Sequence, residues 1–159
     1  MKVGEKVGFR TDNEIGNKGE NAIFNFLSTY PSTTAIIDVT KDEWFQQFDI
    51  DFIWQDTEYN IFKIEVKTDT LADKTGNMVY EIWSDKRTHS KGCFEKTEAD
   101  YIFYYLINTK VLYIFNTQEL RTWVNEHENE LWQTYMGDFA IGYVIPLNDL
   151  KEISIKERL

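Results

Sequence analysis

The sequence predicts an α/β or α+β domain in which a central mixed β-sheet is flanked by helices. An amphipathic helix pattern comes first, a run of strand candidates follows, and a second helix pattern precedes a last strand. This order is typical of a sheet with helices packed on its faces. Residues 1–159 are expected to form a single domain, long enough to bury a hydrophobic core. With 42% hydrophobic and 16% aromatic residues, the chain is not expected to be disordered.

The N-terminal part of the chain predicts one helix followed by three strands. Residues 13–30 have apolar positions at helical spacing, and a proline follows them. The apolar stripe consists of Ile15, Ala22, Ile23, Phe26, Leu27 and Tyr30. Strands are predicted over 33–39 and 48–54, and the polar residues 55–60 predict a turn into a third strand, 61–69. The last two strands would therefore form a hairpin.

The middle of the chain predicts more strands around a basic loop. A strand is expected over 78–83, after a less regular segment. Residues 86–96 form a loop with four positively charged residues against one acid. Two very apolar runs follow, 101–107 and 111–115, and the first of them is expected to be a central strand buried on both faces.

A second helix is predicted from Asn116 through about residue 134. Asn116, with Glu119 three residues later, has the pattern of a capping box. The apolar positions of this helix are Leu120, Trp123, Val124 and Leu131. A strand over 140–145 and a short tail complete the domain.

Charge and cysteine content limit the expected partners and location. The net charge of −10 predicts weak non-specific affinity for nucleic acid. The single cysteine, Cys93, cannot form an intramolecular disulfide, and no apolar run has the length of a secretion signal or a membrane span. A cytoplasmic protein without a membrane segment is therefore expected. Candidates for phosphate contacts in the basic loop, which surface solvation explains nearly as well, are Lys86, Arg87, Lys91 and Lys96.

The strand predicted over 61–69 carries the residues that point to chemistry. Apolar and charged residues alternate along it with a period of two, so Glu65 and Lys67 would lie side by side on one face. A carboxylate can bind a divalent metal ion, and an adjacent ammonium can orient or deprotonate a water molecule. This pair suits hydrolysis of a phosphodiester. The alternative is a solvent-facing strand on which Lys63 pairs with Glu65 and Lys67 with Asp69.

The preceding strand candidate adds acids to this pair. In a strand over 48–54, Asp49 and Asp51 would share one face, and the hairpin would bring Asp51 close to Glu65. Two buried carboxylates repel each other unless a cation lies between them. Hard oxygen ligands favour Mg²⁺ or Mn²⁺ over zinc. Asp49 is the rival for the ligand position, and Asp51 is preferred because an apolar run follows it.

Glu20 is a further acid, contributed by the first helix. It lies three residues before Ile23, at the edge of the buried face of that helix. Either it contributes to the same site as the acids of the hairpin, or it is solvated beside Lys18.

Three segments resemble the motifs of the PD-(D/E)xK nucleases, a superfamily with the restriction-endonuclease-like fold. Residues 18–22, with the apolar helix that follows, resemble the first motif, residues 49–53 the second and residues 64–68 the third. Their order and context agree over residues 14–69, although the second motif lacks the proline that gives the family its name. Beyond residue 70 the resemblance is diffuse.

The resemblance implies a metal-dependent hydrolytic site. Asp51 and Glu65 would bind one or two Mg²⁺ or Mn²⁺ ions, and Glu20 would contribute directly or through water. The main-chain carbonyl of Val66 would be a further ligand. Lys67 would position the attacking water and help to offset charge on the phosphate, or act as a base if the metal lowered its pKa.

The predicted function is therefore that of a Mg²⁺-dependent DNA endonuclease. Within this class we expect an enzyme for branched DNA, similar to Holliday junction resolvases and associated with a phage or mobile element. Symmetrical cutting of two strands would need a homodimer, with the strands 101–115 or the helix 117–134 as the interface. The alternatives are another repair or restriction nuclease of the same fold, and a catalytically inactive member that binds DNA or protein.

Overall fold

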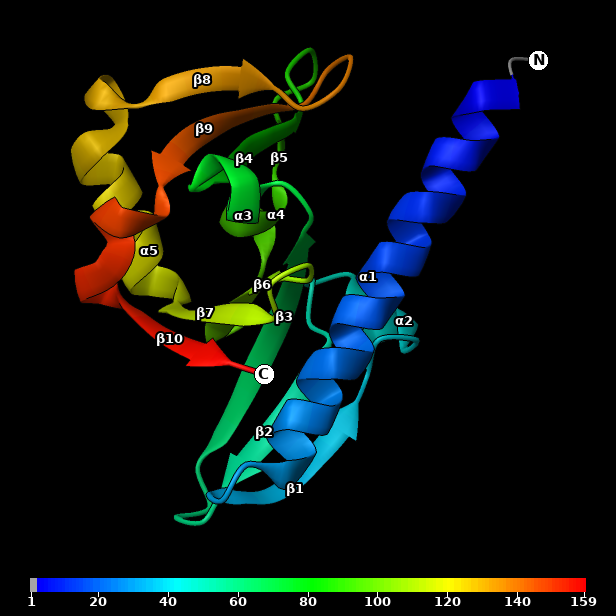
Figure 1. Cartoon of the computed structure of the whole chain (residues 1–159), viewed down its shortest axis with the longest axis vertical. Coiled ribbons are helices and arrows are strands. Elements are labelled where there is room, and N and C mark those ends of the chain that lie inside the picture. The colour runs from blue at the N-terminus through cyan, green and yellow to red at the C-terminus, as the bar shows by residue number, and fades with distance from the viewer. Residues whose placement is uncertain (1–2) are drawn as a thin grey trace.

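Two β-sheets form the framework of the protein (Figure 1). The computed structural model describes residues 3–159, with side chains from residue 12 onward. The larger sheet has the strand order β1-β2-β3-β6-β7-β10, and its neighbours are antiparallel except for the parallel pair β3 and β6. Its strands are β1 (Thr33–Asp38), β2 (Phe52–Asp56), β3 (Ile61–Asp69), β6 (Tyr101–Leu106), β7 (Val111–Asn116) and β10 (Ser154–Arg158).

The smaller sheet is antiparallel, with the strand order β5-β4-β9-β8. Its strands are β4 (Asn77–Asp85), β5 (Ser90–Lys91), β8 (Trp132–Tyr135) and β9 (Ile141–Pro146). A mixed sheet flanked by helices was the predicted class, and the structure confirms it.

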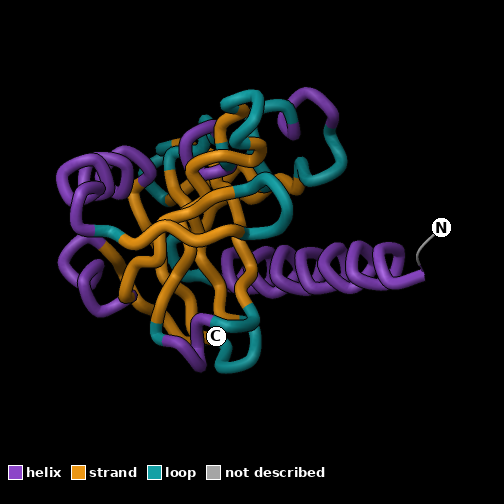
Figure 2. Tube along the Cα trace, turned by 90° about the horizontal axis from the view of Figure 1, so that it is seen from above, coloured by secondary structure: helices purple, strands orange, loops and turns teal. Residues whose placement is uncertain are grey.

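The helices differ greatly in length. The longest is α1 (Val3–Thr29), whose N-terminal part extends away from the sheets in Figure 2. The others are α2 (Glu43–Gln46), α3 (Ala72–Thr75), α4 (Cys93–Lys96), α5 (Thr117–His127) and the 3₁₀ helices η1 (Glu128–Glu130) and η2 (Leu147–Ile153). None of the helices among residues 3–159 has an apolar stretch that could cross a bilayer.

The larger sheet is buried on both faces at strand β6, which is apolar on both sides. Phe103 and Tyr105 pack toward α1, together with Ile23 and Leu27 of that helix. The alternate residues of β6 pack in a second core with the smaller sheet, α5 and η2. These alternate residues are Ile102, Tyr104 and Leu106. The prediction that this strand is central and buried is therefore confirmed. The buried apolar residues of β6 therefore pack within the chain itself and are not available to a second copy.

The predicted strand 48–54 is wrong in its first half. The Asp42 side chain accepts hydrogen bonds from the main-chain N–H groups of Trp44 and Phe45, at 3.0 and 3.3 Å, and this N-cap starts the short helix α2. The chain then passes through Asp49, whose φ of 49° lies in the left-handed region, before β2 begins at Phe52. Asp49 and Asp51 therefore do not share one face of a strand.

The predicted second helix is right at its start and wrong at its end. The Asn116 side chain accepts hydrogen bonds from the N–H groups of Gln118 and Glu119, both at 3.0 Å, so the predicted N-cap is confirmed. The helix ends at His127 rather than near residue 134, because the acid-rich turn that follows has no buried residue to hold it against the core. Its buried residues, Thr117, Leu120 and Val124, face the chain's own core, so they offer no surface for a dimer.

The segments predicted as loop or tail contain further short elements. The basic loop 86–96 holds β5 and α4, and the C-terminal tail forms η2 and β10. Strand β10 pairs with β7 and is one edge of the larger sheet.

Candidate active site

The site forms where β3 loses its partner β2. The ladder between these strands ends at the pair Phe52–Ile64, so within residues 3–159 the edge of β3 is open on this side from Glu65 onward. Asp51 continues the contact without being part of the strand. Its main-chain N–H donates to the carbonyl of Ile64 at 2.8 Å, and its Oδ2 accepts from the N–H of Val66, also at 2.8 Å. Asp51 is thereby fixed against the open edge.

Glu65 and Lys67 lie side by side on one face of β3. Lys67 Nζ is 2.5 Å from Glu65 Oε1, and the Glu65 side chain is only 5% exposed. The Lys67 side chain is 31% exposed, so part of it is reachable from solvent while the Glu65 side chain is buried. The strand period that places the two together is the one expected from their alternation with apolar residues.

The carboxyl groups of Asp51 and Glu65 share this buried space. Burial raises the pKa of Asp51, and hydrogen bonds donated to its carboxylate by Val66 and Glu65, with the positive charge of Lys67, oppose that rise. Burial also raises the pKa of Glu65 well above its ordinary value; Lys67 opposes this rise, and the negative charge of Asp51 adds to it. One ammonium therefore has two buried carboxyl groups to neutralise, and a proton or a cation must supply the rest.

Lys67 itself is held in its charged form. Burial alone would lower its pKa, but the adjacent Glu65 carboxylate outweighs this effect and raises the pKa above its ordinary value. An ammonium held in this way donates hydrogen bonds and offsets negative charge. The expectation that a bound metal ion lowers the pKa of Lys67, so that it acts as a base, concerns the metal-bound state and stays a prediction.

Glu20 reaches the same region because α1 lies unusually close to β3. A Cβ atom on Gly19 would lie 2.8 Å from the Cβ and 3.0 Å from the Cγ2 of Thr68, so only a glycine permits this approach. The next residue, Glu20, is half-buried. Burial raises the pKa of Glu20 to about 7, with a further rise from the carboxylates of Asp51 and Asp38.

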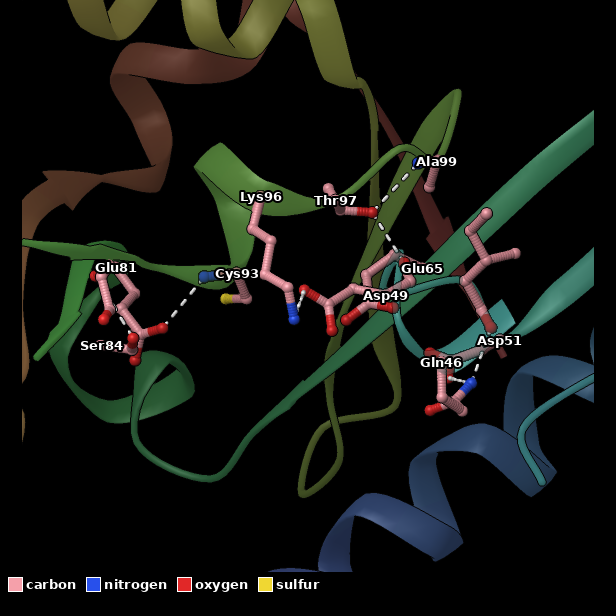
Figure 3. A network of polar contacts seen from close by, with 12 residues as sticks. Gln46, Asp49, Asp51, Glu65, Glu81, Ser84, Cys93, Lys96, Thr97 and Ala99 are labelled. Atoms are coloured by element: carbon pink, nitrogen blue, oxygen red, sulfur yellow. Dashed lines mark hydrogen bonds and ion pairs between the residues drawn. The ribbon is translucent and has the colours of Figure 1, made fainter. Parts of the chain in front are cut away.

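Two further groups lie beside Asp51, the carbonyl of Val66 and the side-chain amide of Gln46. The N–H and C=O groups of one strand residue point to the same side, so the carbonyl of Val66 faces the open edge together with its N–H group. On the other side, Gln46 of α2 donates from Nε2 to the carbonyl of Ile50 at 2.7 Å and to Oδ1 of Asp51 at 3.5 Å (Figure 3). Gln46 was not predicted as a site residue, because the short helix α2, which brings it next to Asp51, was not predicted either.

Asp49, the rival ligand, contacts the C-terminal end of α4. Its carboxylate lies 3.6 Å from Lys96 Nζ, and its main-chain carbonyl accepts from Thr97 Oγ1 at 2.7 Å (Figure 3). These contacts tie the loop before Asp51 to α4. The structure therefore favours Asp51 over Asp49 as the acid at the open edge.

The remaining basic residues do not converge on the site. Arg87 forms a salt bridge with Asp85 at 2.7 Å, and its guanidinium lies 3.3 Å from the centroid of the Phe139 ring. Lys86 and Lys91 are exposed beside it, in and after the turn between β4 and β5. Among the four, Lys96 lies nearest to the acids, through its contact with Asp49.

The ligands predicted from the sequence have the chemistry that a hard divalent ion prefers. They are the carboxylates of Glu20, Asp51 and Glu65 and the carbonyl of Val66, all of them oxygen ligands. The buried carboxyl groups exceed the positive charge available to them, which is the condition under which a cation stabilises such a cluster. Among residues 12–159, no three acidic, His or Cys side chains already converge closely enough to enclose an ion. Binding would require Lys67 and Glu65 to rearrange.

The fold of the chain is similar to that of a bacterial homing endonuclease, I-Ssp6803I. The TM-score is 0.51 and the sequence identity is 16%, over 69% of this chain and 72% of that chain. The likeness concerns the fold alone. No family model matches the chain, and no curated protein matches it in sequence.

Proposed function

We propose that the protein is a DNA endonuclease that hydrolyses phosphodiester bonds at the site formed by Asp51, Glu65 and Lys67. The observation that carries this proposal is the meeting of two buried carboxyl groups and one ammonium at the open edge of β3. The similarity of the fold to that of a homing endonuclease supports it. The order of the three motif-like segments supports membership of the PD-(D/E)xK superfamily.

We propose Mg²⁺ or Mn²⁺ as the cofactor. Asp51 and Glu65 would hold it, with the carbonyl of Val66 and with Glu20 directly or through water. When bound, such an ion lowers the pKa of a coordinated water and offsets charge on the phosphate. Lys67, whose pKa is raised by the adjacent Glu65 carboxylate, would orient the attacking water and donate to the phosphate oxygens. Asp51 keeps its position because Val66 and Gln46 donate hydrogen bonds to it.

The substrate that we propose is branched DNA, and the proposed form is a homodimer that cuts two strands symmetrically. The interface would have to lie outside β6, β7 and α5, whose apolar residues are buried in the chain's own cores. A resolvase of a phage or mobile element, acting in the cytoplasm, is the most specific form of this proposal.

A second candidate is a catalytically inactive domain of the same fold. The net charge of −10 favours it, because a strongly acidic protein repels DNA at long range. The ion pair between Glu65 and Lys67 also leaves each group with a partner inside the chain.

A cleavage assay separates these candidates. Four-way junction, flap, linear duplex and single-stranded DNA would be incubated with the native protein in Mg²⁺, in Mn²⁺ and in EDTA. We expect cleavage of branched substrates in the metal buffers alone. Lys67→Ala and Asp51→Ala should lose it, and Lys63→Ala, a charge change on the same strand, should retain it. Cleavage of linear duplex as efficiently as of junctions would contradict the proposal of a resolvase. No cleavage by the native protein would favour the catalytically inactive candidate.

A further inference from the structure

The cleft next to Lys67 has an exposed aromatic wall. It has a volume of about 600 Å³ and lies between the end of β3, α4 and the tip of the β8–β9 hairpin. Lys67 lines it from β3, and Tyr135 and Met136 line it from the hairpin. Tyr135 is 67% exposed and Met136 is 42% exposed, so much of their apolar surface is available to a partner.

The tip of this hairpin is joined to the basic turn between β4 and β5, and the two turns lie together in Figure 1. The N–H of Lys86 donates to the carbonyl of Phe139 at 2.9 Å, and the guanidinium of Arg87 lies over the ring of Phe139. Lys86 and Lys91 are exposed there. Aromatic and cationic groups therefore adjoin each other at the tip of the hairpin whose Tyr135 and Met136 line the cleft.

This combination matches the chemistry of unpaired nucleotides. Bases that are not stacked in a duplex stack on aromatic side chains, while cations follow their phosphates. Methionine and phenylalanine also insert between base steps as apolar wedges. Because the net charge of −10 weakens phosphate contacts, stacking would have to supply more of the binding energy. The wall is continuous with the cleft that reaches Lys67, which favours the strand being cut over an unrelated protein partner.

We propose that the hairpin tip, residues 135–139, binds unpaired nucleotides next to the phosphate that is placed at Lys67. This inference rests on the proposed nuclease function. Within branched DNA it favours substrates that carry unpaired nucleotides at the branch, such as flaps, over a fully paired four-way junction. Tyr135 stacks on one unpaired base, and Met136 packs beside it. Lys86 and Lys91 contact phosphates of the same strand. The bases of a fully paired linear duplex are stacked on each other and cannot occupy this wall.

Binding measured in EDTA tests this inference without cleavage. Fluorescence anisotropy would compare a duplex that contains a short single-stranded gap with a fully paired duplex of the same length. We expect the native protein to bind the gapped DNA at least about tenfold more tightly. The double variant Tyr135→Ala/Met136→Ala should lose about 5- to 100-fold in affinity for gapped DNA, as expected for the loss of base stacking, and less than about twofold for paired DNA.

Two further variants control for folding and for the loss of any exposed aromatic. Tyr135→Phe keeps the ring and should bind gapped DNA like the native protein. Tyr59→Ala removes a tyrosine that is 74% exposed in the turn between β2 and β3, at the other end of the larger sheet, and should bind normally. Because the substituted side chains are exposed, the thermal unfolding of all variants should match that of the native protein.

The outcomes separate this inference from the proposed hydrolysis. Equal binding of gapped and paired DNA, or equal losses for both in the double variant, would overturn the inference. So would conversion of a dimer to a monomer by the double variant in sedimentation experiments, since the wall would then bind a second copy. If the native protein cleaves no DNA but the double variant still has a lower affinity for gapped DNA than the native protein, the inference stands and the proposed hydrolysis fails. If the native protein cleaves DNA but the double variant binds gapped DNA like the native protein, the proposed hydrolysis stands and the inference fails.

Discussion

The close approach of α1 to β3 predicts a large and specific effect of Gly19→Ala. A Cβ at residue 19 would overlap the Oγ1 of Thr68 and would lie 2.8 Å from its Cβ and 3.0 Å from its Cγ2. A rotation of the Thr68 side chain can move Oγ1 and Cγ2, but it cannot move Cβ. The helix must therefore shift away from the strand, and Glu20 with it.

The expected magnitude follows from two opposing effects. Overpacking a close contact costs about 1–3 kcal/mol, and the fixed Cβ–Cβ contact places this case near the upper end. Alanine is favoured over glycine in a helix by about 1 kcal/mol, which offsets part of that cost. We expect Gly19→Ala to lower the free energy of unfolding by about 2 kcal/mol. Gly16→Ala, one turn earlier in the same helix with no atom within 4 Å of the new Cβ, should raise it by about 1 kcal/mol.

Urea denaturation of the two variants and of a double-mutant cycle with Thr68 measures these values. Thr68→Gly removes every atom that the new Cβ meets and should restore most of the loss. Thr68→Ala leaves the Cβ–Cβ contact and should restore only part of it. Gly19→Ala as stable as Gly16→Ala, or an equal rescue by both changes at residue 68, would refute the reasoning.

Three further predictions concern buried groups near the site. Burial raises the pKa of Cys93 to about 12, so iodoacetamide at pH 8 should alkylate the native protein about 1,000-fold more slowly than the urea-unfolded chain, as followed by mass spectrometry; similar rates would contradict this. Burial and the Asp69 carboxylate raise the pKa of Tyr104, so above pH 10 the unfolded chain loses a proton that the native state keeps, and the free energy of unfolding should fall. Tyr104→Phe should show a smaller fall in urea titrations between pH 9 and 11, and an unchanged pH slope would be inconsistent with the buried phenol. Gln46→Ala leaves the carbonyl of Ile50 without its donor and should lower the free energy of unfolding in urea by about 1 kcal/mol. Gln46→Glu should lower it more, because it adds a negative charge beside Asp51. Equal effects of the two variants would show that Gln46 does not stabilise Asp51.

The parts of the fold that could be predicted are those governed by local periodicity. The period-two alternation of residues 61–69 places Glu65 and Lys67 together, and the continuous apolar run 101–106 identifies a strand buried on both faces. The N-cap at Asn116 could also be predicted, because it depends on residues only three positions apart.

The parts that were missed depend on contacts between distant segments. Asp49 adopts a positive φ while held by Thr97 and Lys96, which lie almost 50 residues later in the chain. Strand β10 ends in three consecutive charged residues, Lys156, Glu157 and Arg158, and forms because the edge of β7 is available to pair with it. The charge state of Lys67 follows from its 2.5 Å contact with Glu65, which the sequence could place but whose effect on the pKa depends on the burial of both groups.

The most direct test of the central claim, that Asp51, Glu65 and Lys67 act together as one hydrolytic site, is the single-turnover cleavage rate in Mg²⁺. Asp51→Asn and Lys67→Met should each slow cleavage by about 100-fold or more. The double variant should be hardly slower than the slower single variant, because groups that act as a unit are not additive. Lys63→Met, on the same face of β3, should cut at the native rate. Cleavage by Asp51→Asn and Lys67→Met within about twofold of the native rate would contradict the claim.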